Sequence, residues 1–136
     1  MRNPRLAEDY FHRATVRLKI LDTLYEESAW ADVVRESQEV VELALKSLLR
    51  LAHVDSPRVH DAGEALMENR QRIPEPARAH VDKLAKYSRR LRRDRELAFY
   101  GSEDLTPTDF YQENYAQEAR SMARETVALV KAAFGA

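Results

Sequence analysis

The sequence of 136 residues contains no cysteine, only three glycines and only five prolines. The lack of cysteine excludes disulfide bonds, thiolate catalysis and zinc sites with cysteine ligands. So few glycines and prolines leave little turn chemistry, which argues against a β-sandwich or barrel and favours helix. No apolar run approaches the roughly 20 residues of a membrane span, and the polar N-terminus differs from a signal peptide. We therefore expect one soluble, cytoplasmic, all-α domain over residues 1–136.

An excess of charge of either sign is also missing. The 22 lysines and arginines nearly cancel the 23 aspartates and glutamates, which leaves a formal net charge of -1. Uniform attraction to nucleic acid or anionic lipid is therefore excluded, whereas a local patch is not. The near-neutral total hides two opposed blocks. The basic segment, residues 86–95, holds six cations and one anion, and the acidic segment, residues 96–120, holds six anions and one cation.

Apolar residues recur every three or four positions along most of the chain, which is the period of one helix face. The predicted helices cover residues 4–27, 30–52, 62–71, 77–100 and 115–134. The second has the widest apolar stripe, so we place it at the centre of the core. The predicted N-terminal caps are Asn3, Ser28, Asp61 with Glu64, and Asn114 with Gln117. The pattern predicts an up-and-down bundle of four long helices and one short helix.

The fourth predicted helix carries charge onto its apolar face. Its apolar positions run through Leu84, Ser88 and Leu91, and the same spacing then reaches Asp94 and Arg95. A charged group on that face must be paired or must line a cleft. The alternative explanation of the whole segment is that cations near the end of a helix complement its dipole and face solvent.

Three segments resemble the HEPN family (higher eukaryotes and prokaryotes nucleotide-binding). Residues 37–49 look like the second helix of HEPN domains, where a Q-x-x-E-x-x-L-K-A-L-L pattern is typical. Residues 59–61, Val-His-Asp, are similar to the motif that opens the family's short third helix. Residues 95–101, followed by Glu103-Asp104 and the last predicted helix, look like the family's C-terminal half. The resemblance covers nearly the whole chain, and the segments occur in the expected order.

The resemblance implies a helical bundle that is commonly a homodimer and is often encoded beside a minimal nucleotidyltransferase, as half of a toxin-antitoxin pair. Active members of the family are metal-independent endoribonucleases. Their motif is an arginine, four to six residues and a histidine, often with a tyrosine two residues further on. The histidine serves as acid or base toward the ribose 2'-hydroxyl, and the arginine stabilises the charged phosphate.

This chain departs from that motif at the histidine. If Tyr100 is aligned with the motif tyrosine, Arg93 falls on the motif arginine and Ala98 on the histidine. If Arg95 is taken as the motif arginine, Tyr100 falls on the histidine instead. Neither register supplies an imidazole, and a tyrosine with an ordinary pKa near 10 is a poor base at neutral pH. The usual ribonuclease chemistry is therefore in question.

The four histidines of the chain all precede the basic segment: they are His12, His53, His60 and His80. His12 follows Arg5 at the motif spacing, but on the first predicted helix, and such a match arises easily by chance. His80 lies on the apolar phase of the fourth helix, which is typical of a half-buried structural histidine. His60 with Asp61 is most simply a helix cap. The spacing of these groups matches no strong metal template, so we expect no metal and no cofactor.

Three functions of different classes remain. In the first, the end of the fourth helix binds phosphate or RNA without cleaving it; the candidate residues are Arg89, Arg92, Arg93, Arg95 and Tyr100. Guanidinium groups match phosphate geometry, and a tyrosine ring stacks on a base. The second function is a ribonuclease that uses Arg93 or Arg95 with a base that is not identified. The third is a structural homodimer in which each basic segment faces the partner's acidic one. The family resemblance also implies Tyr100 as the residue that would accept an adenylyl group from a nucleotidyltransferase partner.

Overall fold

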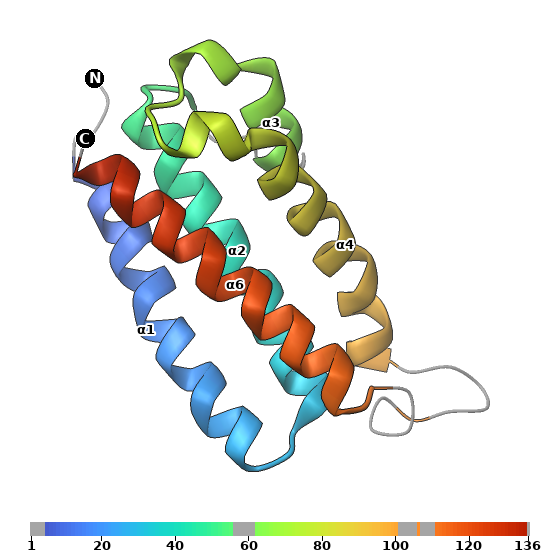
Figure 1. The fold of residues 1–136 in the computed structure, drawn as a ribbon. Helices are drawn as coiled ribbons and strands as arrows, with labels where there is room; N and C mark the ends of the chain where they lie inside the picture. The colour runs from blue at the N-terminus through green and yellow to red at the C-terminus, as the bar shows by residue number, and fades with distance from the viewer. Residues whose placement is uncertain (1–4, 56–61, 101–105, 107–110, 136) are drawn as a thin grey trace.

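The structure, a computed structural model, describes residues 5–55, 62–100, 106 and 111–135, with the backbone alone for residues 96–100. The α-helices of the described residues are α1 (Leu6–Glu26), α2 (Trp30–Leu51), α3 (Ala62–Glu68), α4 (Val81–Tyr100) and α6 (Glu113–Phe134). Two 3-10 turns, Arg70–Arg72 and Ala77–His80, connect α3 with α4. The long helices run alternately up and down, and α3 lies with the turns near one end (Figure 1). This architecture confirms the predicted all-α bundle of four long helices and one short helix.

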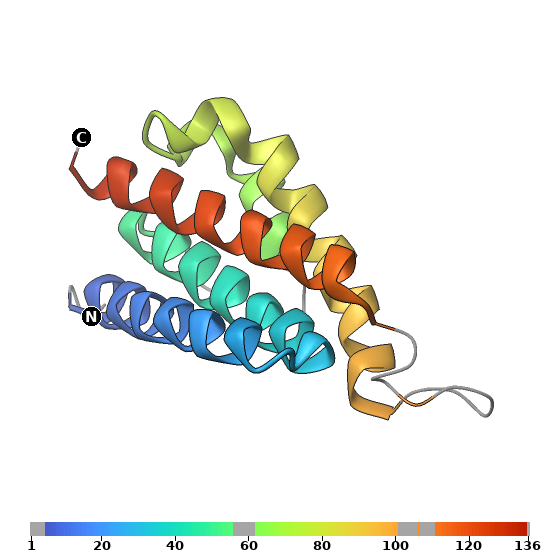
Figure 2. The ribbon, with the colours of Figure 1, turned by 60° about the horizontal axis from the view of Figure 1, so that its bottom comes forward.

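Helix α2 is the centre of the bundle, as its apolar stripe predicts. It packs against α1, α6, α4 and α3, and Leu45, Leu48 and Leu49 on it are fully buried. Helices α1 and α6 lie along α2, whereas α4 leans away from α6 and contacts mainly α2 and α3 (Figure 2). No helix among the described residues is long and apolar enough to cross a membrane.

The turn between α1 and α2 differs from the predicted cap. Ser28 has a φ of 57° and is part of the end of α1, rather than the N-cap of α2. The amide of Ser28 donates to the Tyr25 carbonyl and the amide of Ala29 to the Leu24 carbonyl, which is the Schellman pattern. Ala29 then precedes α2 without a side-chain cap. His53, with a φ of 61°, closes α2 in the same way.

The predicted capping box of Asn114 and Gln117 is wrong. Helix α6 begins at Glu113, with Gln112 as its N-cap and no hydrogen bond from the Gln112 side chain. The backbone carbonyl of Gln112 instead accepts the amide of Tyr115 at 3.1 Å. Asn114 therefore lies inside the first turn, where its side chain cannot act as the cap.

Helix α3 is shorter than its apolar pattern predicts. It ends at Glu68 and not at residue 71, because the Asn69 side-chain amide donates to the Ala65 carbonyl at 2.8 Å and closes the last turn. The other two predicted caps, Asn3 and Asp61, lie outside the described residues.

Candidate functional site

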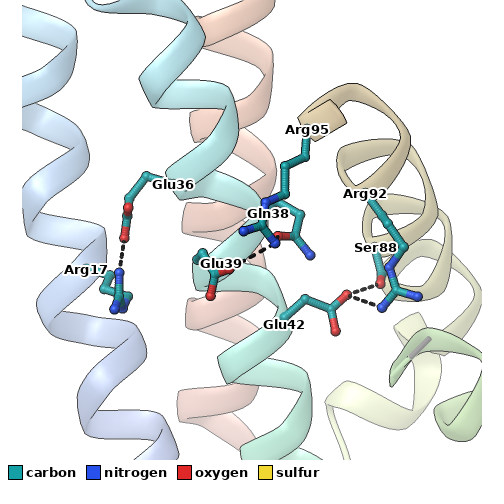
Figure 3. A network of polar contacts seen from close by, with 8 residues as sticks. All are labelled: Arg17, Glu36, Gln38, Glu39, Glu42, Ser88, Arg92 and Arg95. Atoms are coloured by element: carbon teal, nitrogen blue, oxygen red, sulfur yellow. Dashed lines mark hydrogen bonds and ion pairs between the residues drawn. The ribbon is translucent and has the colours of Figure 1, made fainter. Parts of the chain in front are cut away.

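The face of α4 that packs on α2 carries a buried polar contact. Glu42 of α2 is only 9% exposed, and its Oε1 accepts hydrogen bonds from Ser88 Oγ at 2.7 Å and from Arg92 Nη2 at 3.2 Å (Figure 3). Ser88 is itself 1% exposed. A carboxylate removed from water needs such partners, because an unpaired buried charge is costly. The ion pair between Glu42 and Arg92 therefore holds Arg92 against α2.

Arg95 lies on the same face of α4, one turn further along. Its Nη1 is 3.0 Å from Gln38 Oε1 and 3.1 Å from Glu39 Oε1, both on α2 (Figure 3). The apolar phase of α4 predicts that a charge at this position is paired or lines a cleft, and the structure shows Arg95 paired. The partners on α2 lie within or beside residues 37–49, the segment that resembles the second helix of the HEPN family.

The acidic row of α2 is also bound on its other side, by α1. Arg17 Nη1 lies 2.7 Å from Glu36 Oε1, and this hydrogen bond and the charge of Glu36 raise the pKa of Arg17 (Figure 3). The row Glu36, Glu39 and Glu42 therefore forms ion pairs with α1 and with α4. These carboxylates hold helices together and orient the arginines that they contact.

A second face of α4 carries three exposed cations between the cleft toward α6, which Lys86 borders, and the cleft toward α3, which Arg89 borders. Lys86, Arg89 and Arg93 are exposed, and we call these three residues the outward cations. Their spacings of three and four residues place them on one face of a helix. The Arg93 side chain is 75% exposed, and its Nε lies 3.6 Å from its neighbour Asp94. Within the described part of the chain, neither Lys86 nor Arg89 has a carboxylate partner.

A third side of α4 faces α6 across a cleft of about 370 Å³. Arg90 pairs with Glu118 there, and this hydrogen bond lowers the pKa of Glu118. Lys83 and Tyr87 both bind Glu125, which lowers the pKa of Glu125. Burial, together with the bond to Glu125, raises the pKa of Tyr87 to about 12. Arg90 and Glu118 thus pair the basic and acidic segments within one chain.

The structure divides the predicted site into two groups. Arg92 and Arg95 face α2 and are paired, whereas Arg89 and Arg93 face outward. Tyr100 is the last residue of α4, and its side chain lies outside the description. The sequence contains a signal for this division, because positions 88, 92 and 95 share one helical phase and positions 86, 89 and 93 share another.

None of the described histidines lies on α4, the helix of the outward cations. His80 ends the 3-10 turn before α4, thirteen residues before Arg93, which is about 20 Å along a helix axis. His12 is on α1, His53 closes α2, and His60 lies outside the described residues. Among the described residues, no group of three or more histidines and acids is arranged to hold a metal ion.

Tyr111 makes a hydrogen bond to α4 that the sequence did not predict. It is 1% exposed, and its hydroxyl donates to the Asp94 carbonyl oxygen near the end of α4. Its ring meets Tyr115 edge-on, with centroids 5.8 Å apart. Burial raises the pKa of Tyr111 to about 12, so the hydroxyl stays protonated and donating at neutral pH. Tyr111 thereby ties the start of α6 to the part of α4 that carries the arginines.

A family model described as HEPN domain matches residues 7–133 of the chain. The matched range includes all three faces of α4 and the acidic row of α2. Comparisons with curated proteins and with solved structures gave no match.

Proposed function

The chain belongs to the HEPN domain family, and on that premise we propose that it binds the phosphates of RNA through the outward cations Lys86, Arg89 and Arg93. The family supports a nucleotide- or RNA-related module in general. The observation that carries the proposal is the division of the basic segment. Arg90, Arg92 and Arg95 are each paired with a glutamate on another helix, whereas the described residues give the outward cations no carboxylate from another helix. Arg93 meets its neighbour Asp94 at 3.6 Å, but its side chain is 75% exposed, so this ion pair is weak.

The outward cations carry the positive charge that is available to phosphates, because the other arginines of the basic segment are paired with glutamates. A guanidinium group held by a carboxylate has its charge largely compensated, so it attracts a polyanion weakly. The outward cations keep their charge, and Arg89 and Arg93 are about 6 Å apart along the helix axis. Each of the two guanidinium groups binds one phosphate through its planar set of N–H donors, so that the two arginines hold successive phosphates. Such contacts release counterions from RNA and make the affinity depend on salt.

Binding without cleavage is favoured by the residues of α4. Transfer of a proton from the ribose hydroxyl needs a base within hydrogen-bond reach of the reacting group. Helix α4 contains no histidine, so the acid or base of the family's ribonuclease motif is missing from it. Arg92 and Arg95, the partners of Glu42 and Glu39, then orient the end of the helix instead of acting on the phosphate. Tyr100 remains a candidate for stacking on a base.

The family also supports a proposal about assembly. We propose that the chain acts as a homodimer beside a minimal nucleotidyltransferase, as in a toxin-antitoxin pair, and that Tyr100 accepts an adenylyl group from that partner. HEPN domains often dimerise, which favours the homodimer. In light scattering the dimer has twice the chain mass of 15.7 kDa, and a monomer at micromolar concentration would contradict it.

Fluorescence anisotropy with an oligouridylate of about twelve nucleotides tests the binding proposal. The double variant Arg89→Gln/Arg93→Gln is compared with Arg13→Gln/Lys19→Gln, which removes two exposed cations from α1. We expect the α4 variant to bind about tenfold more weakly and the α1 control to bind like the parent chain. Equal losses in both variants would refute the site. A gel of the same RNA after incubation reports cleavage, and products that disappear with Arg93 would favour the ribonuclease.

A further inference from the structure

Beside Arg89, helix α3 presents an exposed methionine and two glutamates. Met67 is 40% exposed, so its thioether is accessible from solvent. Together with Glu64, Glu68 and Arg89 it lines a shallow cleft of about 450 Å³ between α3 and α4. This volume lies within the range of small-molecule sites. We propose that the α3–α4 cleft is a nucleobase subsite that selects guanine in single-stranded RNA, an inference that rests on the proposed function.

Met67 and Arg89 together form a platform for an aromatic ring. Arg89 Nη1 lies 3.9 Å from Met67 Sδ, so the thioether and the guanidinium group are in contact. A polarizable sulfur makes favourable contacts with aromatic rings, and arginine stacks its plane on unpaired bases. The exposed apolar surface of Met67 becomes covered when a base lies on it. This platform fits any base and sets the position of the ring, not its identity.

The two carboxylates supply the selectivity. Glu64 and Glu68 are four residues apart, so they share one face of α3, and both are exposed. The described residues provide no ion pair for either of them. Like charges at this spacing destabilise a helix, and Glu68, the last residue of α3, also opposes the helix dipole. Glu64, in the first turn of α3, complements the dipole, so helix stability leaves only Glu68 unexplained. Both carboxylates are exposed and open to a hydrogen-bond donor.

Guanine is the base whose edge fits a carboxylate. An ionised carboxylate only accepts hydrogen bonds, through two oxygens. The Watson–Crick edge of guanine offers two adjacent donors, N1–H and the N2 amino group, which meet both oxygens. Uracil presents a single N–H between two carbonyl oxygens, and these repel a carboxylate. In a duplex the same edge is already paired, so the subsite favours single strands.

The position of the cleft separates backbone from base. Glu64 and Glu68 repel phosphate, so the RNA backbone stays on the outward cations of α4. Arg89 belongs to both surfaces, since it lines the cleft and lies one turn before Arg93. A phosphate at Arg93 and a base at Met67 are then contacts of one short stretch of RNA.

Anisotropy with single-site oligonucleotides tests the subsite. The probes are an oligouridylate and the same strand with one guanosine, inosine, adenosine or cytidine. We expect the guanosine strand to bind about tenfold more tightly than oligouridylate, with inosine between them because it lacks the N2 amino group. Glu64→Gln and Glu68→Gln are each tested beside Glu8→Gln, which neutralises an exposed glutamate on α1. The ratio of the two affinities is the readout, because loss of a negative charge strengthens binding to every RNA.

At least one of the α3 variants must reduce the guanosine ratio to less than a third of the parent value, while Glu8→Gln leaves it unchanged. Equal binding of all five probes would overturn the subsite and leave the phosphate site standing. A preference for adenosine or cytidine, or a guanosine preference that survives in both α3 variants, would also overturn it. A parent chain that binds no probe would refute the phosphate site and the subsite together.

Discussion

Replacement of Glu42 by alanine should destabilise the chain more than any other change in the acidic row of α2. Glu42 is the buried acceptor for Ser88 and Arg92. Without it, the hydroxyl of Ser88 stays 1% exposed and loses its charged acceptor, for which a carbonyl of its own helix is a poorer substitute. Arg92 loses an ion pair, but its side chain is 43% exposed and becomes solvated.

The expected cost follows from these two losses. An orphaned buried hydroxyl costs about 1–3 kcal/mol, and a half-exposed ion pair contributes at most about 1 kcal/mol after screening. Because Ser88 recovers part of its loss through the helix backbone, we expect Glu42→Ala to lower the free energy of unfolding by about 2 kcal/mol. Glu42→Gln keeps an acceptor for Ser88 and should cost about half as much. For a chain of this size, 2 kcal/mol lowers the melting temperature by about 8 °C.

Urea unfolding followed by circular dichroism measures these differences. Glu39→Ala is the matched control, because Glu39 is on the same helix but its side chain is 35% exposed; its cost should stay below about 1 kcal/mol. Ser88→Ala combined with Glu42→Ala should cost about 1 kcal/mol less than the sum of the single changes, since the hydrogen bond between the two side chains is then lost only once. Additive costs, or equal costs for Glu42→Ala and Glu39→Ala, would refute the reasoning.

Two further changes concern Tyr111, which is buried, and Tyr87, which is half-buried. Tyr111→Phe removes the bond to the Asp94 carbonyl and should lower the free energy of unfolding by about 1 kcal/mol, whereas Tyr10→Phe on α1 should leave urea unfolding unchanged. The pKa of Tyr87 is raised from 10 to about 12, so the folded chain holds this proton more tightly than the unfolded chain does. Its stabilising contribution is present below pH 10 and is lost as the pH rises from 10 to 12, and Tyr87→Phe should flatten that decline in thermal unfolding. A decline that persists unchanged in Tyr87→Phe would contradict the assignment.

Helical periodicity predicted the architecture because burial is a repeating property of the sequence. The stripe of α2 placed it at the centre, and the phase of Leu84, Ser88 and Leu91 predicted a paired charge beyond them. The partners themselves were not predictable. Gln38, Glu39 and Glu42 meet α4 only because of the angle at which the two helices cross, which periodicity does not encode.

Helix ends were predicted less well, because several local signals compete there. Ser28 has a good capping side chain, yet the turn uses it in the left-handed conformation to close α1. Asn114 and Gln117 have the capping-box spacing, but α6 begins at Glu113, two residues after the buried Tyr111. Tertiary packing decided between these alternatives.

The arginines of α4 also show that a sequence does not reveal which charges are paired. Composition and spacing brought Arg89, Arg92, Arg93 and Arg95 together as one patch, because the sequence counts charges and not their partners. The acidic row of α2 compensates Arg92 and Arg95, and the outward pair with Lys86 remains. The candidate site is therefore narrower than the sequence predicted, and it lies on a different face of α4 from the buried polar contacts.

The salt dependence of RNA binding tests the central claim most directly. Each cation that contacts a phosphate of single-stranded RNA contributes about 0.7 to the slope of log affinity against log salt. The triple variant Lys86→Gln/Arg89→Gln/Arg93→Gln should therefore bind with a slope that is shallower by about 2, while Arg13→Gln/Lys19→Gln keeps the parent slope. An unchanged slope in the triple variant would show that RNA contacts the chain elsewhere and would contradict the assignment of the outward cations.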